Sequence, residues 1–117
     1  MKKFKILFLS AALFAAPFAY AQDDFEVLIP RYEWPDEASA DVVLQIPQIR
    51  RAVSRLLKSE DAELIVRYPG GDAGNQWALD LRAMLISLGI ESKYIVLEPG
   101  SGIDETMVVL VAPKRGQ

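Results

Sequence analysis

The stretch from Leu64 to Gly102 constrains the fold of this chain most, because each boundary in it has a physical cause. An apolar, β-branched run at 62–68 predicts a buried strand. A helix is expected from about residue 73 to residue 88, and Gly89 fits the left-handed position that ends a helix. Another strand is expected at 94–97. A strand, helix and strand in this order normally form a parallel crossover, so this stretch predicts an α/β fold.

The expected helix at 73–88 has recognisable ends and one apolar side. Pro69-Gly70-Gly71 stops the strand before it, and Asp72 is the predicted N-cap because its carboxylate can accept free N–H groups of the first turn. Ile90 is expected to fold back on the last turn. The residues predicted to form the buried stripe are Ala78, Leu81, Leu85 and Leu88, widened by Trp77 and Met84.

The remaining elements complete a small mixed sheet. Strands are expected at 25–29 and 107–111, and a first helix begins near Pro47, where a proline costs no hydrogen bond. The segment 38–45 is left open between a short strand and the entry to a helix. The order β-α-β-α-β-β predicts two helices packed on one face of the sheet. The apolar stripe predicted for the first helix consists of Ile46, Ile49, Val53, Leu56 and Leu57.

The first residues have the pattern of a cleavable signal peptide. Three lysines precede the apolar run 6–18, and Ala19-Tyr20-Ala21 fits the cleavage signature, so we expect cleavage after Ala21. The apolar run is shorter than the roughly 20 residues that span a bilayer, so no stable membrane insertion is expected after cleavage. We therefore expect a periplasmic protein. The predicted division is 1–21 signal peptide, 22–45 N-terminal strand and extended segment, 46–113 remainder of one domain, and 114–117 basic tail.

Composition narrows the chemistry further. The chain has no cysteine and no histidine, which removes disulfides and the common zinc and copper ligands, and we expect no metal or cofactor. Loss of the three leader lysines changes the formal charge from −3 to −6, which is poorly suited to nucleic acid. The acidic run at Glu60, Asp61 and Glu63 is interpreted as solvated surface.

Neither glycine-rich loop carries a recognised catalytic motif. The loop 69–75 has the spacing GGxxG without the lysine and hydroxyl of a P-loop, so it is either a tight turn or the wall of a ligand pocket. Ser101 has no histidine base and is expected to belong to a turn. We therefore expect a protein that is not an enzyme. A small hydrolase with paired carboxylates is the alternative.

Three residues of the second helix region are candidates for binding a ligand. They are Asp72, Asn75 and Arg82, because a guanidinium fork beside an apolar stripe can bind a carboxylate. The competing interpretation is a salt bridge of Arg82 with Asp72 or Asp80. Separately, the aromatic residues Tyr32, Trp34 and Trp77 are expected to cover the core, or, if exposed, to anchor a protein partner.

Asn75, the pair Arg82-Ala83 and the helix end Gly89-Ile90 resemble the OmpA C-terminal-like domain family over roughly residues 46–102. The resemblance implies a periplasmic β-α-β-α-β-β fold that binds peptidoglycan, with Asp72, Asn75 and Arg82 holding the peptide stem. The alternative partner is an envelope protein, bound by an interaction or assembly subunit without peptidoglycan affinity.

The chain departs from this family in its loop. It has Tyr68-Pro69-Gly70-Gly71 where the family has Gly-His/Tyr-Thr/Ala-Asp. Counting back from Arg82 places the family's aspartate at Arg67, whereas counting back from Gly89 places the family's arginine near Trp77. The register of the binding pair therefore stays open at this point.

Overall fold

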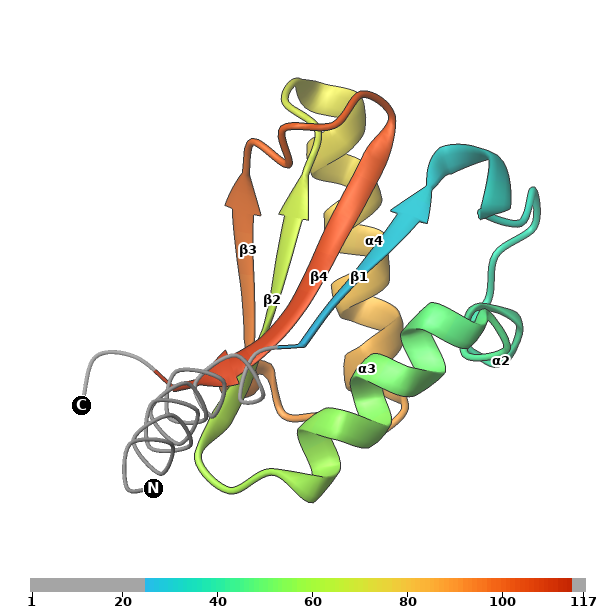
Figure 1. The fold of residues 1–117 in the computed structure, drawn as a ribbon. Helices are drawn as coiled ribbons and strands as arrows, with labels where there is room; N and C mark the ends of the chain where they lie inside the picture. Colours follow the sequence, from blue (N-terminus) through green and yellow to red (C-terminus); the bar gives the residue numbers. More distant parts are fainter. Residues whose placement is uncertain (1–24, 115–117) are drawn as a thin grey trace, which may run out of the picture.

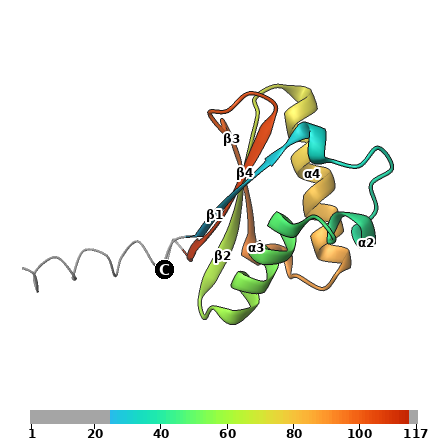
Figure 2. The same cartoon turned by 45° about the vertical axis from the view of Figure 1, so that its right-hand side comes forward.

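A computed structural model describes residues 25–114 as a four-stranded sheet with helices on one side (Figure 1). The strands are β1 (Phe25–Pro30), β2 (Ala62–Tyr68), β3 (Ile95–Pro99) and β4 (Thr106–Pro113). The longer helices α3 (Pro47–Lys58) and α4 (Asp72–Ser87) lie on the same face (Figure 2). The predicted mixed sheet with two helices on one face is confirmed. The predicted signal peptide, its cleavage site and the basic tail from 115 onward lie outside the described residues.

The strand order β1-β4-β2-β3 places the last strand between the first and the second. β4 runs antiparallel to both of its neighbours, and β2 runs parallel to β3. β1 and β3 are therefore the two edges. Pro30, which has no N–H to donate, ends an edge strand, where a missing ladder bond is tolerated.

Helix α3 begins at Pro47 as predicted, and its apolar stripe faces the sheet with one exception. Ile49, Ala52 and Leu56 are buried, whereas Leu57 is 69% exposed. The prediction that Leu57 belongs to the buried stripe is wrong. Each residue advances about 100° around a helix, so Leu57 turns away from the face on which Leu56 is buried.

Helix α4 begins one residue earlier than predicted. Gly71, with φ of +95°, is the N-cap and Asp72 is the first helical residue, so the prediction of Asp72 as N-cap is wrong. This backbone conformation favours a glycine. Gly74 is needed for a different reason, because a Cβ there would lie 1.8 Å from the carbonyl oxygen of Pro69.

The end of α4 follows the predicted motif but not the predicted stripe. Gly89 has φ of +108°, and the Ile90 N–H donates to the Leu85 carbonyl at 3.1 Å, as in a Schellman motif. Ile90 is buried, but Leu88 is 40% exposed, so its placement in the buried stripe is wrong. The helix ends before Leu88, and Ile90 provides the last apolar contact in its place.

The segment before α3 is less extended than predicted. It contains the 3-10 turn η2 (Arg31–Glu33) and the short helix α2 (Ala40–Val43), which resolves the open question at 38–45 in favour of a helix. The Ser39 hydroxyl accepts a long bond from the Val42 N–H at 3.5 Å. A second 3-10 turn, η3 (Ser92–Tyr94), takes Tyr94 out of the predicted strand, which begins at Ile95.

Candidate functional site

The structure separates the three predicted ligand-binding residues. Asp72 and Asn75 lie exposed in the first turn of α4, where the Asn75 amide donates to the Tyr68 hydroxyl at 3.1 Å. Arg82 is half-buried and ten residues beyond Asp72, which corresponds to about 15 Å along a helix. One end of α4 therefore carries Asp72 and Asn75, and Arg82 lies two to three turns away from them.

The two glycine-rich loops meet at the same end of the sheet. The N–H groups of Gly100 and Ser101 both donate to the carbonyl of Tyr68, at 2.8 and 3.1 Å. The Ser101 hydroxyl donates to the Ile103 carbonyl at 3.0 Å and accepts from the Ile103 N–H at 3.3 Å. Ser101 thus uses its hydroxyl within a local turn, and these loops are tied together by their own backbone.

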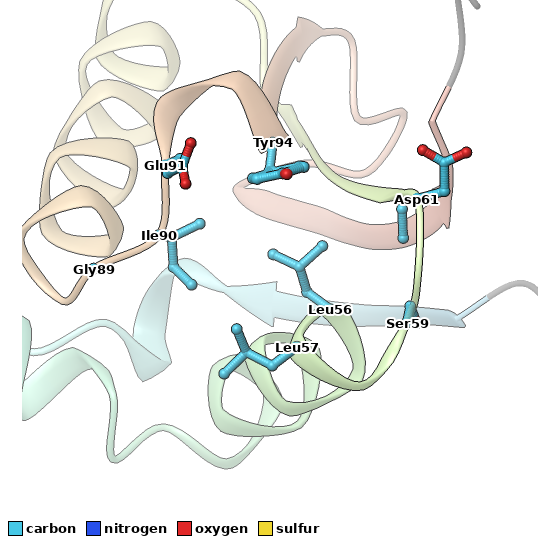
Figure 3. A pocket seen from close by; sticks show the side chains of 9 residues that line it. Leu56, Leu57, Ser59, Asp61, Gly89, Ile90, Glu91 and Tyr94 are labelled. Carbon is cyan, nitrogen blue, oxygen red and sulfur yellow. The ribbon is translucent and has the colours of Figure 1, made fainter.

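A pocket of about 250 Å³ lies at the opposite end of the sheet (Figure 3). Leu56, Leu57 and Ile90 form its apolar side, and Tyr94 lies across from them. The carboxylates of Asp61 and Glu91 lie at its two ends. This pocket is formed where α3 leads into β2 and α4 leads into β3.

The rim of this pocket includes one residue with a left-handed backbone conformation and two lysines. Asp61 has φ of +60°, a left-handed conformation that aspartate tolerates better than most residues. Lys93 pairs with Glu91 at 3.7 Å, and the ammonium groups of Lys93 and Lys114 lie 5.2 and 5.4 Å from the Tyr94 ring centroid. The two carboxylates at the mouth are thus partly offset by two ammonium groups, so the pocket has no strong charge preference.

The two tryptophans pack against each other between η2 and α4. Their ring centroids are 5.7 Å apart in an edge-to-face arrangement, and the Arg31 guanidinium lies 4.6 Å from the centroid of Trp77. Trp77 is only 3% exposed, so it cannot anchor a partner, and that interpretation of Trp77 is wrong. Its indole N–H has no hydrogen-bond partner among the described residues. Trp34 is half-buried and Tyr32 is 84% exposed.

A hollow of about 680 Å³ opens beside this aromatic pair. One wall is the segment 31–38, which contributes Tyr32, Trp34 and Asp36, and the other is the outer side of α4 with Asp80 and Met84. Both aspartates are exposed. We call this the Tyr32 hollow.

The face of the sheet opposite the helices forms a further candidate surface. Strand side chains alternate between faces. The buried cluster under the helices contains Leu64, Val66, Met107 and Val109, and it does not include their neighbours Ile65 and Val108. No helix of the described residues covers this second face, as Figure 2 shows. We call it the open face.

The pairing of the strands arranges the open face into two rows. One row reads Glu26, Leu110, Ile65, Val96 across the four strands, and the next reads Leu28, Val108, Arg67, Glu98. Five adjacent apolar side chains therefore lie between charged corners. They are Leu28, Val108, Leu110, Ile65 and Val96, of which Leu28 is 42% exposed and Ile65 and Val108 are 4% and 5% exposed.

Charged groups border the apolar centre of the open face. Arg67 and Glu98 form an ion pair at 3.0 Å, and Glu26 is exposed at the opposite corner. Glu63, expected on solvated surface, is only 4% exposed, so that prediction is wrong for this residue. Glu63 is two residues before Ile65 on β2, so its side chain lies on the same face of the sheet as that of Ile65. The border of the open face therefore carries the carboxylate of Glu26 and the ion pair of Arg67 with Glu98.

The open face was missed in the sequence, although a signal for it was present. The runs Leu64-Ile65-Val66 and Val108-Val109-Leu110-Val111 are apolar in both alternating phases. Such runs predict strands that are covered on both sides. The helices of the described residues cover only one side of the sheet. The alternate apolar residues of these runs, Ile65, Val108 and Leu110, therefore lie on the open face.

No protein-family model matches this chain, and no curated protein matches it. Within residues 25–114, acidic side chains do not gather in groups of three or more able to hold a metal ion. No helix in this part of the chain is long and apolar enough to cross a membrane.

Proposed function

We propose that this chain is an exported, non-enzymatic binding module of the cell envelope, and that its open face binds a protein partner. The observation that carries the proposal is the group of five adjacent apolar side chains on a sheet face without a helix. Leu28 is 42% exposed and Leu110 and Val96 are half-buried, whereas Ile65 and Val108 lie beneath them at 4% and 5% exposed. Apolar surface beside a sheet face without a helix marks interaction sites on soluble domains. β4 and β2 support it from the centre of the sheet, so the surface is rigid.

The charge at the border indicates the kind of partner. Glu26 is exposed at one corner of the open face, and Glu98 pairs with Arg67 at another. The segment after the expected cleavage site has a formal charge of −6, so a second copy of the chain would be repelled. We therefore expect an apolar protein surface flanked by lysine or arginine.

Site-specific photo-crosslinking in a Gram-negative host tests this proposal. A photoreactive phenylalanine analogue at Leu28 should give one discrete adduct, and the same analogue at Gln76, exposed on the outer side of α4, should give none. The adduct should be lost in Leu110→Arg, which places a charge in the apolar centre. Equal crosslinking from both positions, or an adduct unaffected by Leu110→Arg, would reject the open face as the binding surface.

Localisation is tested separately from binding. The proposal requires release of the chain with the periplasmic fraction and an N-terminus at Gln22. Recovery of the protein with Met1 intact in the cytoplasmic fraction would contradict it.

Peptidoglycan association is the second candidate, supported by the element order that the family resemblance implies. Asp72 and Asn75 are exposed at the N-terminal end of α4, where the helix dipole and free N–H groups favour polar ligands. Purified sacculi should sediment the protein, and Asp72→Ala should weaken sedimentation. Because Arg82 lies about 15 Å along the helix from Asp72, only a ligand extended along α4 would reach both residues. Absence of co-sedimentation would reject this candidate.

A further inference from the structure

We propose that the Tyr32 hollow is a binding site for a neutral glycan, with Tyr32 and Trp34 as the aromatic surface and Asp36 and Asp80 as hydrogen-bond acceptors. The site is separate from the open face and goes beyond the protein-binding role proposed above. A pyranose ring has a flat C–H face and a rim of hydroxyl groups. An aromatic ring beside carboxylates matches both parts of that chemistry.

Tyr32 has the surface property that such a site needs. It is 84% exposed, the highest value among the large apolar side chains that the structure describes. Its ring therefore contributes little to the core. A large aromatic ring that is exposed beside a hollow is available for stacking on a ligand, and aromatic residues of this kind dominate binding energies at interfaces.

Trp34 is held in place before any ligand arrives. The backbone N–H of Trp34 donates to the Arg31 carbonyl at 3.0 Å, and the Trp34 ring packs edge-to-face on buried Trp77. Arg31 is itself fixed, because its backbone N–H donates to the Glu105 carbonyl at 2.8 Å and its guanidinium lies over the Trp77 ring. Fixing the platform in advance lowers the entropy lost on binding.

The polar groups on the other side favour a neutral, hydroxyl-rich ligand. Asp80 accepts one bond from the Gln76 amide at 2.9 Å through one oxygen, which leaves its second oxygen facing solvent or a ligand. Asp36 is exposed on the facing wall. Two carboxylates against one guanidinium disfavour an anionic ligand. The volume of about 680 Å³ lies within the roughly 300–1,000 Å³ that ligand sites occupy.

Titration with chitotetraose, a neutral tetrasaccharide, tests the proposal on the mature chain. The two tryptophans allow the site to be located, because Trp34 lines the hollow and Trp77 lies buried behind it. We expect a saturable change in tryptophan fluorescence that persists in Trp77→Phe and is lost in Trp34→Phe. Calorimetry on the same samples should report the same affinity.

Substitutions then separate the proposed contacts from the rest of the surface. Tyr32→Ala should weaken chitotetraose binding at least tenfold, and Asp80→Asn about threefold. Asp41→Asn is the matched control, because Asp41 is exposed on α2 and does not line the hollow. Circular dichroism should show all three variants folded, since each changes an exposed side chain.

Two outcomes would overturn the glycan proposal. One is no fluorescence change and no heat at a probe concentration of about 10 mM, well above a millimolar dissociation constant. The other is binding that Tyr32→Ala and Asp41→Asn leave equally intact. Either result would leave the crosslinking test of the open face unaffected, so the two proposals fail independently.

Discussion

The two faces of this sheet are formed by the same strands but have different surroundings. Val108 and Val109 are consecutive residues of β4, are 5% and 1% exposed, and point to opposite faces. Val109 belongs to the cluster that α3 and α4 cover, whereas Val108 lies on the open face. The comparison shows that consecutive residues of one strand can lie in two different environments, one covered by helices and one without a helix.

The covered face owes its stability to close packing. Leu64, Val66, Leu81 and Met107 are at most 1% exposed, and the first turn of α4 lies so close to the loop after β2 that a Cβ at residue 74 would overlap the Pro69 carbonyl. Burying apolar side chains in a packed interior supplies most of the favourable free energy of folding. On the open face, Leu28, Val96 and Leu110 partly reach solvent, and charged side chains border them.

The largest expected effect tests how tightly the first turn of α4 is packed against the loop that precedes it. Gly74→Ala should lower the free energy of unfolding by about 3 kcal/mol, because the added carbon overlaps the Pro69 carbonyl at 1.8 Å. Urea denaturation followed by circular dichroism measures it. Gly70→Ala is the control, since nothing lies within 4 Å of its Cβ position and its φ is not left-handed. Equal stability of the two variants would show that the first turn of α4 does not pack closely on the Pro69 carbonyl.

A matched pair of valines compares the faces directly. Val109→Ala should cost about 2 kcal/mol, from two lost carbon groups and the cavity that they leave. Val108→Ala should cost less, about 1.5 kcal/mol, because Val108 is 5% exposed and loses the same burial, but no helix closes a cavity over it. The loss of β-propensity is common to both variants, so the difference between their unfolding free energies isolates packing.

The same two valine variants can also contradict the difference between the covered face and the open face. If Val108→Ala costs as much as Val109→Ala, the open face is closed by something in solution. A loss that grows as the protein is diluted would then identify a second copy as the cover.

The smallest expected effect concerns the ion pair at the corner of the open face. Arg67 and Glu98 are 3.0 Å apart, with side chains 44% and 27% exposed. A double-mutant cycle with Arg67→Ala and Glu98→Ala should give a coupling energy below about 1 kcal/mol. A coupling of several kcal/mol would mean that the corner is desolvated, contrary to an open face.

Much of the fold was predictable, because local signals and tertiary packing agree. Pro47 begins α3, Gly89 ends α4, and the apolar run at 62–68 forms β2, all as predicted. Predictions failed where the last apolar residue of a helix was assigned to the core. Leu57 points away from the buried face of α3, and Leu88 lies beyond the last residue of α4.

The predicted site was less accessible to sequence reasoning than the fold. Asp72, Asn75 and Arg82 are close in sequence, but a helix spaces them about 1.5 Å per residue along its axis, so they do not meet by proximity in the chain. The Tyr32 hollow joins residues 31–38 to Asp80 and Met84, which are more than 40 positions apart. Such an encounter depends on how η2 packs against α4.

The sequence by itself determined the elements and their order, since turn residues, caps and apolar periodicity act over a few positions. Only the tertiary structure decided which apolar phase of β2 and β4 is covered. Both phases are equally apolar in Leu64-Ile65-Val66 and in Val108-Val109, so local pattern cannot distinguish them. The positions of α3 and α4 make the distinction, because two helices on one face of a four-stranded sheet leave the other face open.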